Sequence, residues 1–62
     1  MTPGEKLREC RGTTSRKEVA ESVKISVSAL QMYECDTRVP RDVVKQRLAD
    51  YYNKTVQEIF FT

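Results

Sequence analysis

The sequence has no histidine and no tryptophan, and only two cysteines, two glycines and two prolines among its 62 residues. Without histidine, neither a Cys–His pair nor a Ser–His–Asp triad is available for nucleophilic catalysis. Two cysteines are too few for a structural zinc site, which needs four Cys or His ligands. The sequence also lacks a glycine-rich phosphate loop. We therefore expect no enzyme activity, no metal site and no cofactor.

Long hydrophobic runs are also missing. No apolar stretch approaches the roughly 20 residues that cross a bilayer, and none follows the polar start Met1–Lys6 as a secretion signal requires. We expect a cytoplasmic protein. In that compartment Cys10 and Cys35 are expected to be free thiols, although their spacing leaves a disulfide open.

The chain is short and nearly balanced in charge. Its net charge is +2, with 39% hydrophobic and 32% charged residues, a composition typical of a folded domain rather than a disordered tail. A chain of this length buries only about 60% of the surface that its unfolded form exposes, which leaves no room for a deep cavity. We expect one domain over residues 1–62 and no small-molecule ligand.

Helix-capping patterns divide the chain at regular intervals. A Ser or Thr followed three residues later by Glu occurs at Thr2, Ser15 and Thr55, and this pattern marks helix starts. It predicts helices over residues 3–11, 16–23 and 56–61. Ser26 is the expected cap of a helix over 27–34. A helix over 41–52 follows Pro40, and Asn53 is its expected left-handed terminator. The sequence therefore predicts an all-α, five-helix domain.

The apolar residues recur at helical spacing within these segments, which predicts one buried face on each helix. The expected core residues are Leu7, Cys10, Val19, Ala20, Val23, Ala29, Leu30, Tyr33, Val44, Leu48, Ala49 and Tyr52. Only three residues separate the helices over 16–23 and 27–34, so the two must pack at a steep angle. This is a helix-turn-helix pattern.

Several of these residues occur together in an order and spacing that resemble the phage repressor/Cro-like (Xre-type) helix-turn-helix family. The resemblance covers about residues 5–61 and is carried by Arg8-Glu9, Arg11-Gly12, Ser15-x-x-Glu18-Val19-Ala20, Ile25-Ser26, Leu30-x-x-Tyr33-Glu34, Arg38-x-Pro40, Leu48-Ala49 and Ile59-Phe60. It implies a lambda-repressor-like fold and a transcriptional regulator that binds an operator in double-stranded DNA, most simply as a Cro-like repressor.

The resemblance also implies an ion pair between Arg8 and Glu34. The alternative for Arg8 is a solvated surface arginine, since exposed ion pairs contribute little. The sequence departs from the family at Lys24, where glycine is usual, so either Lys24 adopts a left-handed conformation at a modest cost or the turn adjusts. It also departs in the loop from Gly12 to Ser15, which is one residue longer.

Basic residues are concentrated on both sides of the helix-turn-helix. Residues 1–17 hold five basic and two acidic groups and residues 35–47 hold four and two, whereas residues 18–34 hold one basic and three acidic groups. Such segments suit phosphates that pass a helix inserted in the major groove. We expect phosphate contacts from Arg16, Lys17, Arg38 and Arg41. The alternative is that each cluster is a solvated helix face.

The exposed side of the helix over 27–34 is the expected base-reading surface. Its candidates are Ser26, Val27, Ser28, Gln31 and Met32. Gln31 has the amide that suits adenine, and Val27 suits a thymine methyl group. Met32 either contacts the duplex or fills space against the following loop. No arginine occurs in this helix, so we expect a preference for A·T pairs and DNA shape.

One recognition helix covers too few base pairs to specify an operator, so a homodimer is expected. The candidate interface residues are Tyr51, Phe60 and Phe61. The alternative is that Tyr52, Ile59 and Phe60 close the monomer core while Phe61 frays. A different function also stays open, in which the helix-turn-helix is a protein-interaction module, such as an antitoxin or anti-repressor, that binds its partner through Phe60 and Phe61.

Overall fold

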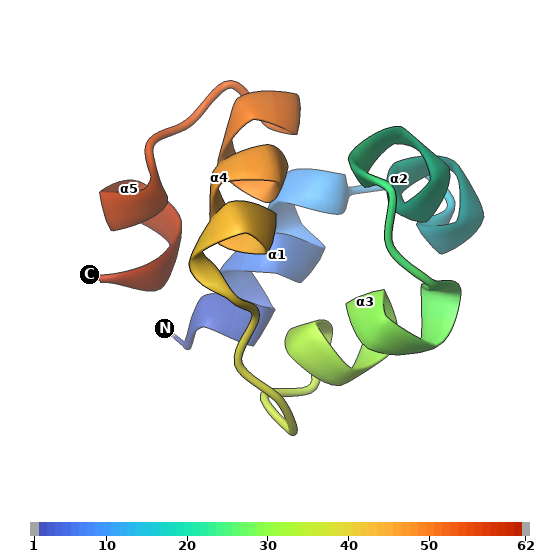
Figure 1. Cartoon of the computed structure of the whole chain (residues 1–62), viewed down its shortest axis with the longest axis horizontal. Coiled ribbons are helices and arrows are strands. Elements are labelled where there is room, and N and C mark those ends of the chain that lie inside the picture. The colour runs from blue at the N-terminus through green and yellow to red at the C-terminus, as the bar shows by residue number, and fades with distance from the viewer. Residues whose placement is uncertain (1, 62) are drawn as a thin grey trace.

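Five α-helices form the protein, as seen in a computed structural model that describes residues 2–61. They are α1 (Pro3–Arg11), α2 (Arg16–Val23), α3 (Val27–Glu34), α4 (Asp42–Tyr51) and α5 (Val56–Phe60) (Figure 1). No residue in the described range belongs to a β-strand. The all-α, five-helix prediction is confirmed, and the first three helices have the predicted bounds.

The last two helices are slightly shorter than predicted. Arg41 and Tyr52 flank α4 as cap residues instead of belonging to it, and Phe61 caps the C-terminal end of α5. These one-residue differences arise because the terminal residues keep only part of the helical hydrogen bonding.

Side-chain caps begin four of the helices, as the sequence predicts. The hydroxyl groups of Thr2, Ser15, Ser26 and Thr55 each accept a hydrogen bond from the backbone N–H three residues later. At α1 and α5 the glutamate carboxylate also accepts a hydrogen bond from the backbone N–H of the cap residue, which completes a capping box. At α2 the Ser15 hydroxyl accepts from the Glu18 N–H, and among residues 2–61 no bond from the Ser15 N–H to the Glu18 carboxylate completes the box.

Left-handed residues end the helices at the predicted turns. Lys24 has φ 61° and ψ 48°, and Asn53 has φ 60°. The conformation of Lys24 is the one that glycine adopts without steric cost, which explains why glycine is usual at this position in the family. Asp36, which the sequence did not mark, is also left-handed, with φ 59°.

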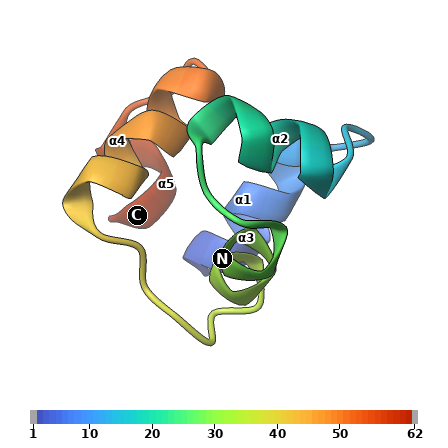
Figure 2. The ribbon, with the colours of Figure 1, turned by 45° about the vertical axis from the view of Figure 1, so that its right-hand side comes forward.

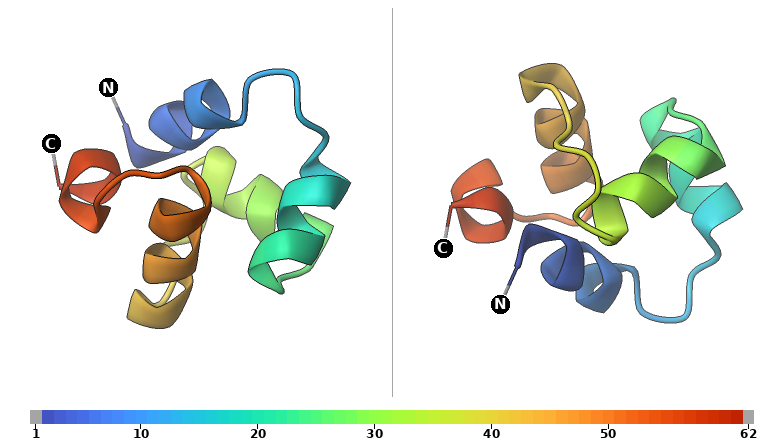
Figure 3. Two further views of the ribbon diagram at one scale, coloured as in Figure 1. Left: turned by 90° about the horizontal axis from the view of Figure 1, so that it is seen from above. Right: turned by 90° about the horizontal axis from the view of Figure 1, so that it is seen from below.

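The helices pack in a closed order around one core. Each helix has its main contacts with two others, in the order α1, α3, α2, α4, α5 and back to α1. Figure 3 shows α5 next to α1, and Figure 1 shows α2 and α3 on the side of the molecule away from α5. The buried hydrophobic residues are Leu7, Val19, Ala20, Val23, Leu30, Tyr33, Leu48, Ala49 and Ile59. Ala29, Val44 and Tyr52 pack against this core while partly exposed.

A long-range contact fixes the start of α1 against the end of α3. Thr2 Oγ1 donates a hydrogen bond to Asp36 Oδ2 at 2.6 Å, and the Gly4 backbone N–H donates to Asp36 Oδ1 at 2.9 Å. These two bonds hold the pKa of Asp36 below its usual value. A Cβ atom on Gly4 would lie 2.8 Å from the Asp36 carboxyl carbon and would press on the carbonyl oxygen of Glu34. Only glycine permits this approach.

None of the helices in residues 2–61 has the length and apolar character needed to cross a membrane.

Candidate nucleic-acid interface

The α2–turn–α3 unit is a rigid platform for an exposed helix. The turn spans Lys24 to Ser26, and the Ile25 N–H donates to the Ala20 carbonyl at 2.9 Å. Ala20 is buried and Ala29 is partly buried, so small side chains permit the close approach of the two helices. Figure 2 shows α3 nearly end-on, with α1 and α2 on one side of it. The other side of α3 is left open.

The two faces of α3 differ sharply in exposure. Leu30, Tyr33 and Glu34 are buried. Four of the five predicted base-reading residues are exposed, namely Ser26, Val27, Ser28 and Gln31, and the fifth, Met32, is partly buried. Val27 is 42% exposed at the first position of the helix. Val27 therefore contributes an exposed apolar group to the open face of α3.

Glu34 is the centre of an ion-pair cluster that joins α1, α2 and α3. Its side chain is 0% exposed and accepts from Arg11 Nε at 2.8 Å and from Arg16 Nε at 2.9 Å. The predicted pair between Arg8 and Glu34 is therefore wrong among the described residues, and Arg8 is exposed. Arg8 and Arg11 both lie in the last turn of α1, and Arg11, at its final position, is the one that reaches the buried carboxylate.

The two arginines of this cluster have different environments. Arg11 also donates from Nη2 to Glu34 at 3.3 Å and from Nη1 to the Thr14 carbonyl at 2.8 Å, so all its nitrogens are engaged. Its side chain is 17% exposed. Arg16 uses only Nε and is 37% exposed. The hydrogen bond from Arg16 to Glu34 raises the pKa of Arg16 above its usual value, and the neighbouring charge adds to the effect.

The four predicted phosphate contacts lie in two places. Arg16 and Lys17 form the first turn of α2, which the Arg16–Glu34 pair holds at the C-terminal end of α3. Arg38 and Arg41 both line one depression of about 290 Å³ with Tyr33, Val39 and Val44. Lys17, Arg38 and Arg41 are exposed. The four cations therefore form two pairs, one in the first turn of α2 and one between α3 and α4.

Two of the three predicted interface residues, Phe60 and Phe61, form a partly apolar surface at the end of α5. Phe61 is 64% exposed, and Lys45 Nζ lies 5.0 Å from the centre of its ring and 5.6 Å from that of Phe60. Both rings line a depression of about 240 Å³ with Val39 and Pro40. Tyr51 is 40% exposed and lies near the other end of α4, with its ring edge against Tyr52.

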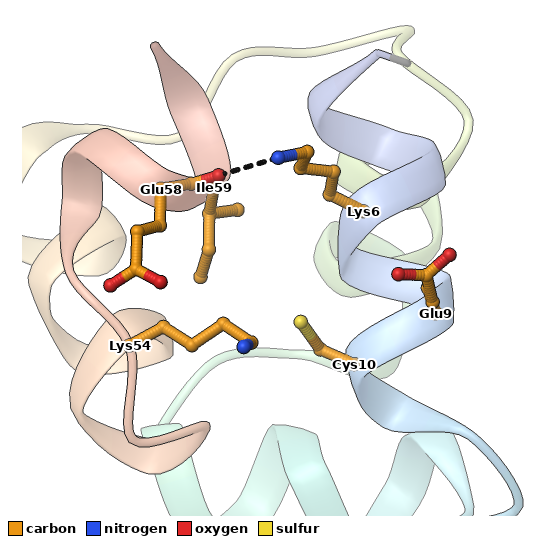
Figure 4. Close-up of a pocket in the computed structure, with 6 residues that line it drawn as sticks. All are labelled: Lys6, Glu9, Cys10, Lys54, Glu58 and Ile59. Carbon is orange, nitrogen blue, oxygen red and sulfur yellow. Dashed lines mark hydrogen bonds between the residues drawn. The ribbon is translucent and has the colours of Figure 1, made fainter. Parts of the chain in front are cut away.

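The α1–α5 side carries a further depression of about 170 Å³, and most of the residues that line it are charged. Lys6 Nζ donates to the Glu58 carbonyl oxygen at 2.9 Å across its rim, and Cys10 and Lys54 face each other within it (Figure 4). Cys10 and Cys35 are free thiols, as expected. Burial raises the pKa of Cys10.

Three features of the site region were not foreseen from the sequence: the role of Arg11, the contacts of Asp36, and the buried hydroxyl of Tyr52. The Tyr52 hydroxyl oxygen has no hydrogen-bond partner among the described residues. Burial raises the pKa of this phenol well above its usual value. No local pattern marks the contacts from Arg11 to Glu34 or from Thr2 and Gly4 to Asp36, because each joins residues far apart in the sequence.

Comparison with known proteins agrees with this arrangement. A model of the helix-turn-helix family matches residues 5–59, nearly the whole chain. The protein therefore belongs to the Xre/Cro-like helix-turn-helix family, a family of DNA-binding regulators rather than of enzymes. No curated protein sequence matches the chain.

Proposed function

We propose that this protein is a Cro-like repressor that binds an operator in duplex DNA as a homodimer and lowers transcription from a neighbouring promoter. The single observation that carries the proposal is the open face of α3, on which Ser26, Val27, Ser28 and Gln31 are exposed beside a half-exposed Met32. A role in transcription also implies a cytoplasmic location.

The base-reading step rests on the chemistry of that face. Gln31 presents a carboxamide that pairs with adenine through two hydrogen bonds, and Val27 packs on the thymine methyl group. Ser26 and Ser28 accept or donate to either kind of base, and Met32 adds apolar contact. Because α3 has no arginine, the usual two-bond contact to guanine is missing. The operator is therefore expected to be rich in A·T pairs at the contacted positions.

Phosphate contacts position the helix and supply most of the salt dependence. We assign these contacts to Arg16, Lys17, Arg38 and Arg41. Arg38 and Arg41 share one depression, so they suit neighbouring phosphates on the same strand.

Selection of bound duplexes from a random pool tests the reading. The expected outcome is a two-fold symmetric consensus with A·T pairs at the contacted positions, and Gln31→Ala is expected to relax one position of each half-site at a cost of about 1–3 kcal/mol. Gln46→Ala, an exposed glutamine on α4, is the matched control. A G·C-rich consensus, or a consensus that Gln31→Ala leaves unchanged, contradicts the assignment.

The homodimer is assigned to Tyr51, Phe60 and Phe61. Phe61 is 64% exposed, and Val39, which lines the same depression, is 76% exposed. Exposed apolar groups that cluster in this way are typical of an interaction surface. Phe60 packs on the core with part of its surface, so the exposed Phe61 is expected to supply more of the contact.

The same surface favours the second candidate, a protein-interaction module that binds a different protein. Sedimentation equilibrium distinguishes the two. A monomer–dimer equilibrium that Phe61→Ala shifts toward monomer, with Val43→Ala at an exposed position of α4 as control, supports the homodimer. A wild-type chain that stays monomeric both alone and on DNA, and that copurifies with another protein in stoichiometric amount, favours the interaction module.

A further inference from the structure

Glu34 holds two arginines, and the two are not equivalent. All three types of guanidinium nitrogen of Arg11 donate to Glu34 or to the Thr14 carbonyl. Each guanidinium nitrogen of Arg11 therefore has one acceptor within the protein. Arg16 donates only from Nε, and its Nη1 and Nη2 make no hydrogen bond to any other residue in the range 2–61. Its side chain is also twice as exposed as that of Arg11.

The formal charges of the cluster do not cancel. Two guanidinium groups share one carboxylate, which leaves one positive charge in excess at the junction of α1, α2 and α3. Each guanidinium nitrogen of Arg11 already has an acceptor. The excess charge is therefore assigned to Arg16, whose Nη1 and Nη2 are available as donors. A planar guanidinium held by Nε presents Nη1 and Nη2 together, which is the arrangement that matches the oxygens of a phosphate.

From this geometry we infer that Glu34 is a positioning residue for DNA binding: it fixes Arg16 so that the two terminal nitrogens of its guanidinium group grip one backbone phosphate. This inference rests on the proposed function. A flexible surface arginine loses side-chain freedom when it binds, whereas Arg16 is already ordered by a carboxylate that is 0% exposed. Arg16 therefore belongs to the buried cluster and to the DNA surface at once.

Lysine at position 16 separates this role from that of a simple positive charge. Its single ammonium group is a point charge that cannot hold Glu34 through one nitrogen while it presents two others to a phosphate. We expect Arg16→Lys to lower the affinity for the selected operator about tenfold, the usual scale for a charge-assisted hydrogen bond. The slope of log affinity against log salt concentration is expected to stay as in the wild type, because the charge is kept.

Glutamine at position 16 removes the charge as well. Arg16→Gln is expected to weaken binding further and to reduce the salt slope by about 1. Arg8→Gln is the matched control, since it removes the same charge from an exposed position of α1 that makes no ion pair with Glu34. It is expected to change affinity less than twofold. Urea unfolding of each variant establishes that binding is measured on folded protein.

The outcomes separate the possible explanations. The inference is supported by a loss of affinity in Arg16→Lys at constant slope together with a lower slope in Arg16→Gln. It is overturned if Arg16→Lys binds as tightly as the wild type, or if both variants lose affinity with an unchanged slope, which is the result of a purely structural role. A wild-type chain that binds no duplex overturns the proposed function and this inference together.

Discussion

Glu34→Gln is the substitution that tests the structural basis of the fold most severely. It keeps the size and shape of the side chain and removes one negative charge from a position that is 0% exposed. In the wild type the carboxylate accepts three hydrogen bonds, two from Arg11 and one from Arg16. The amide of glutamine has one acceptor oxygen, and its NH₂ group would face a guanidinium group that also only donates.

The magnitude follows from the burial of the three partners. Breaking one side of a fully buried ion pair costs about 3–5 kcal/mol, because an uncompensated charge is left inside. Here Arg16 is 37% exposed and regains part of its hydration, whereas Arg11 at 17% regains little. We expect a loss of about 3 kcal/mol in the free energy of unfolding. A domain of this length has a total stability of roughly 3–9 kcal/mol, so this loss removes at least about a third of the free energy of unfolding.

Urea unfolding followed by far-ultraviolet circular dichroism at neutral pH measures this loss. Glu21→Gln is the matched control, because it removes the same charge from an exposed position on α2 and is expected to stay within about 0.5 kcal/mol of the wild type. If Glu34→Gln is no more destabilising than Glu21→Gln, the buried cluster does not hold the three helices together and the reasoning fails.

Four further substitutions test other parts of the fold. Gly4→Ala is expected to lose about 2 kcal/mol or more, because its Cβ meets the carboxyl group of Asp36 and the Glu34 carbonyl; a change below 0.5 kcal/mol in urea unfolding would contradict the close approach. Lys24→Gly is expected to raise stability by about 0.5–1 kcal/mol, since φ 61° strains a residue with a Cβ, and a lower melting temperature would count against this. Tyr52→Phe removes a buried hydroxyl without a partner and is expected to be neutral or stabilising; a loss above 1 kcal/mol would reveal a partner for the hydroxyl. Asp36 has a lowered pKa in the folded state, so its stabilising contribution is complete above its usual pKa of 3.8 and is lost as pH falls through the lower folded value. In Asp36→Asn this part of the acid dependence is expected to disappear, and an unchanged unfolding profile between pH 5 and pH 2 would refute the assignment.

The helices could be predicted closely because their signals are local. Thr2, Ser15, Ser26 and Thr55 each bond to a backbone group three residues away, so a short window of sequence contains both partners. The same holds for the left-handed ends at Lys24 and Asn53. The apolar residues at helical spacing also identified the buried faces, because burial depends on which side of a helix a residue occupies.

The contacts between distant residues could not be predicted in the same way. Arg8 and Arg11 both lie in the last turn of α1, and no local pattern decides which of them pairs with Glu34. Asp36 lies 34 residues from Thr2 and 32 from Gly4, and no spacing rule joins them. The exposed face of α3 was predictable from the pattern of its buried residues. The pairing of Arg16 with Glu34, which leaves Nη1 and Nη2 for the proposed phosphate contact, was not, because it joins two different helices.

Fluorescence anisotropy tests most directly whether α3 reads a specific duplex. The protein is titrated into labelled DNA from the region upstream of its own gene and into a scrambled duplex of equal composition, each at low and near-physiological salt. We predict saturable binding to the upstream DNA that persists at the higher salt, while binding to the scrambled duplex is lost. Equal binding to both duplexes that the higher salt abolishes, or no binding to either, would contradict the claim.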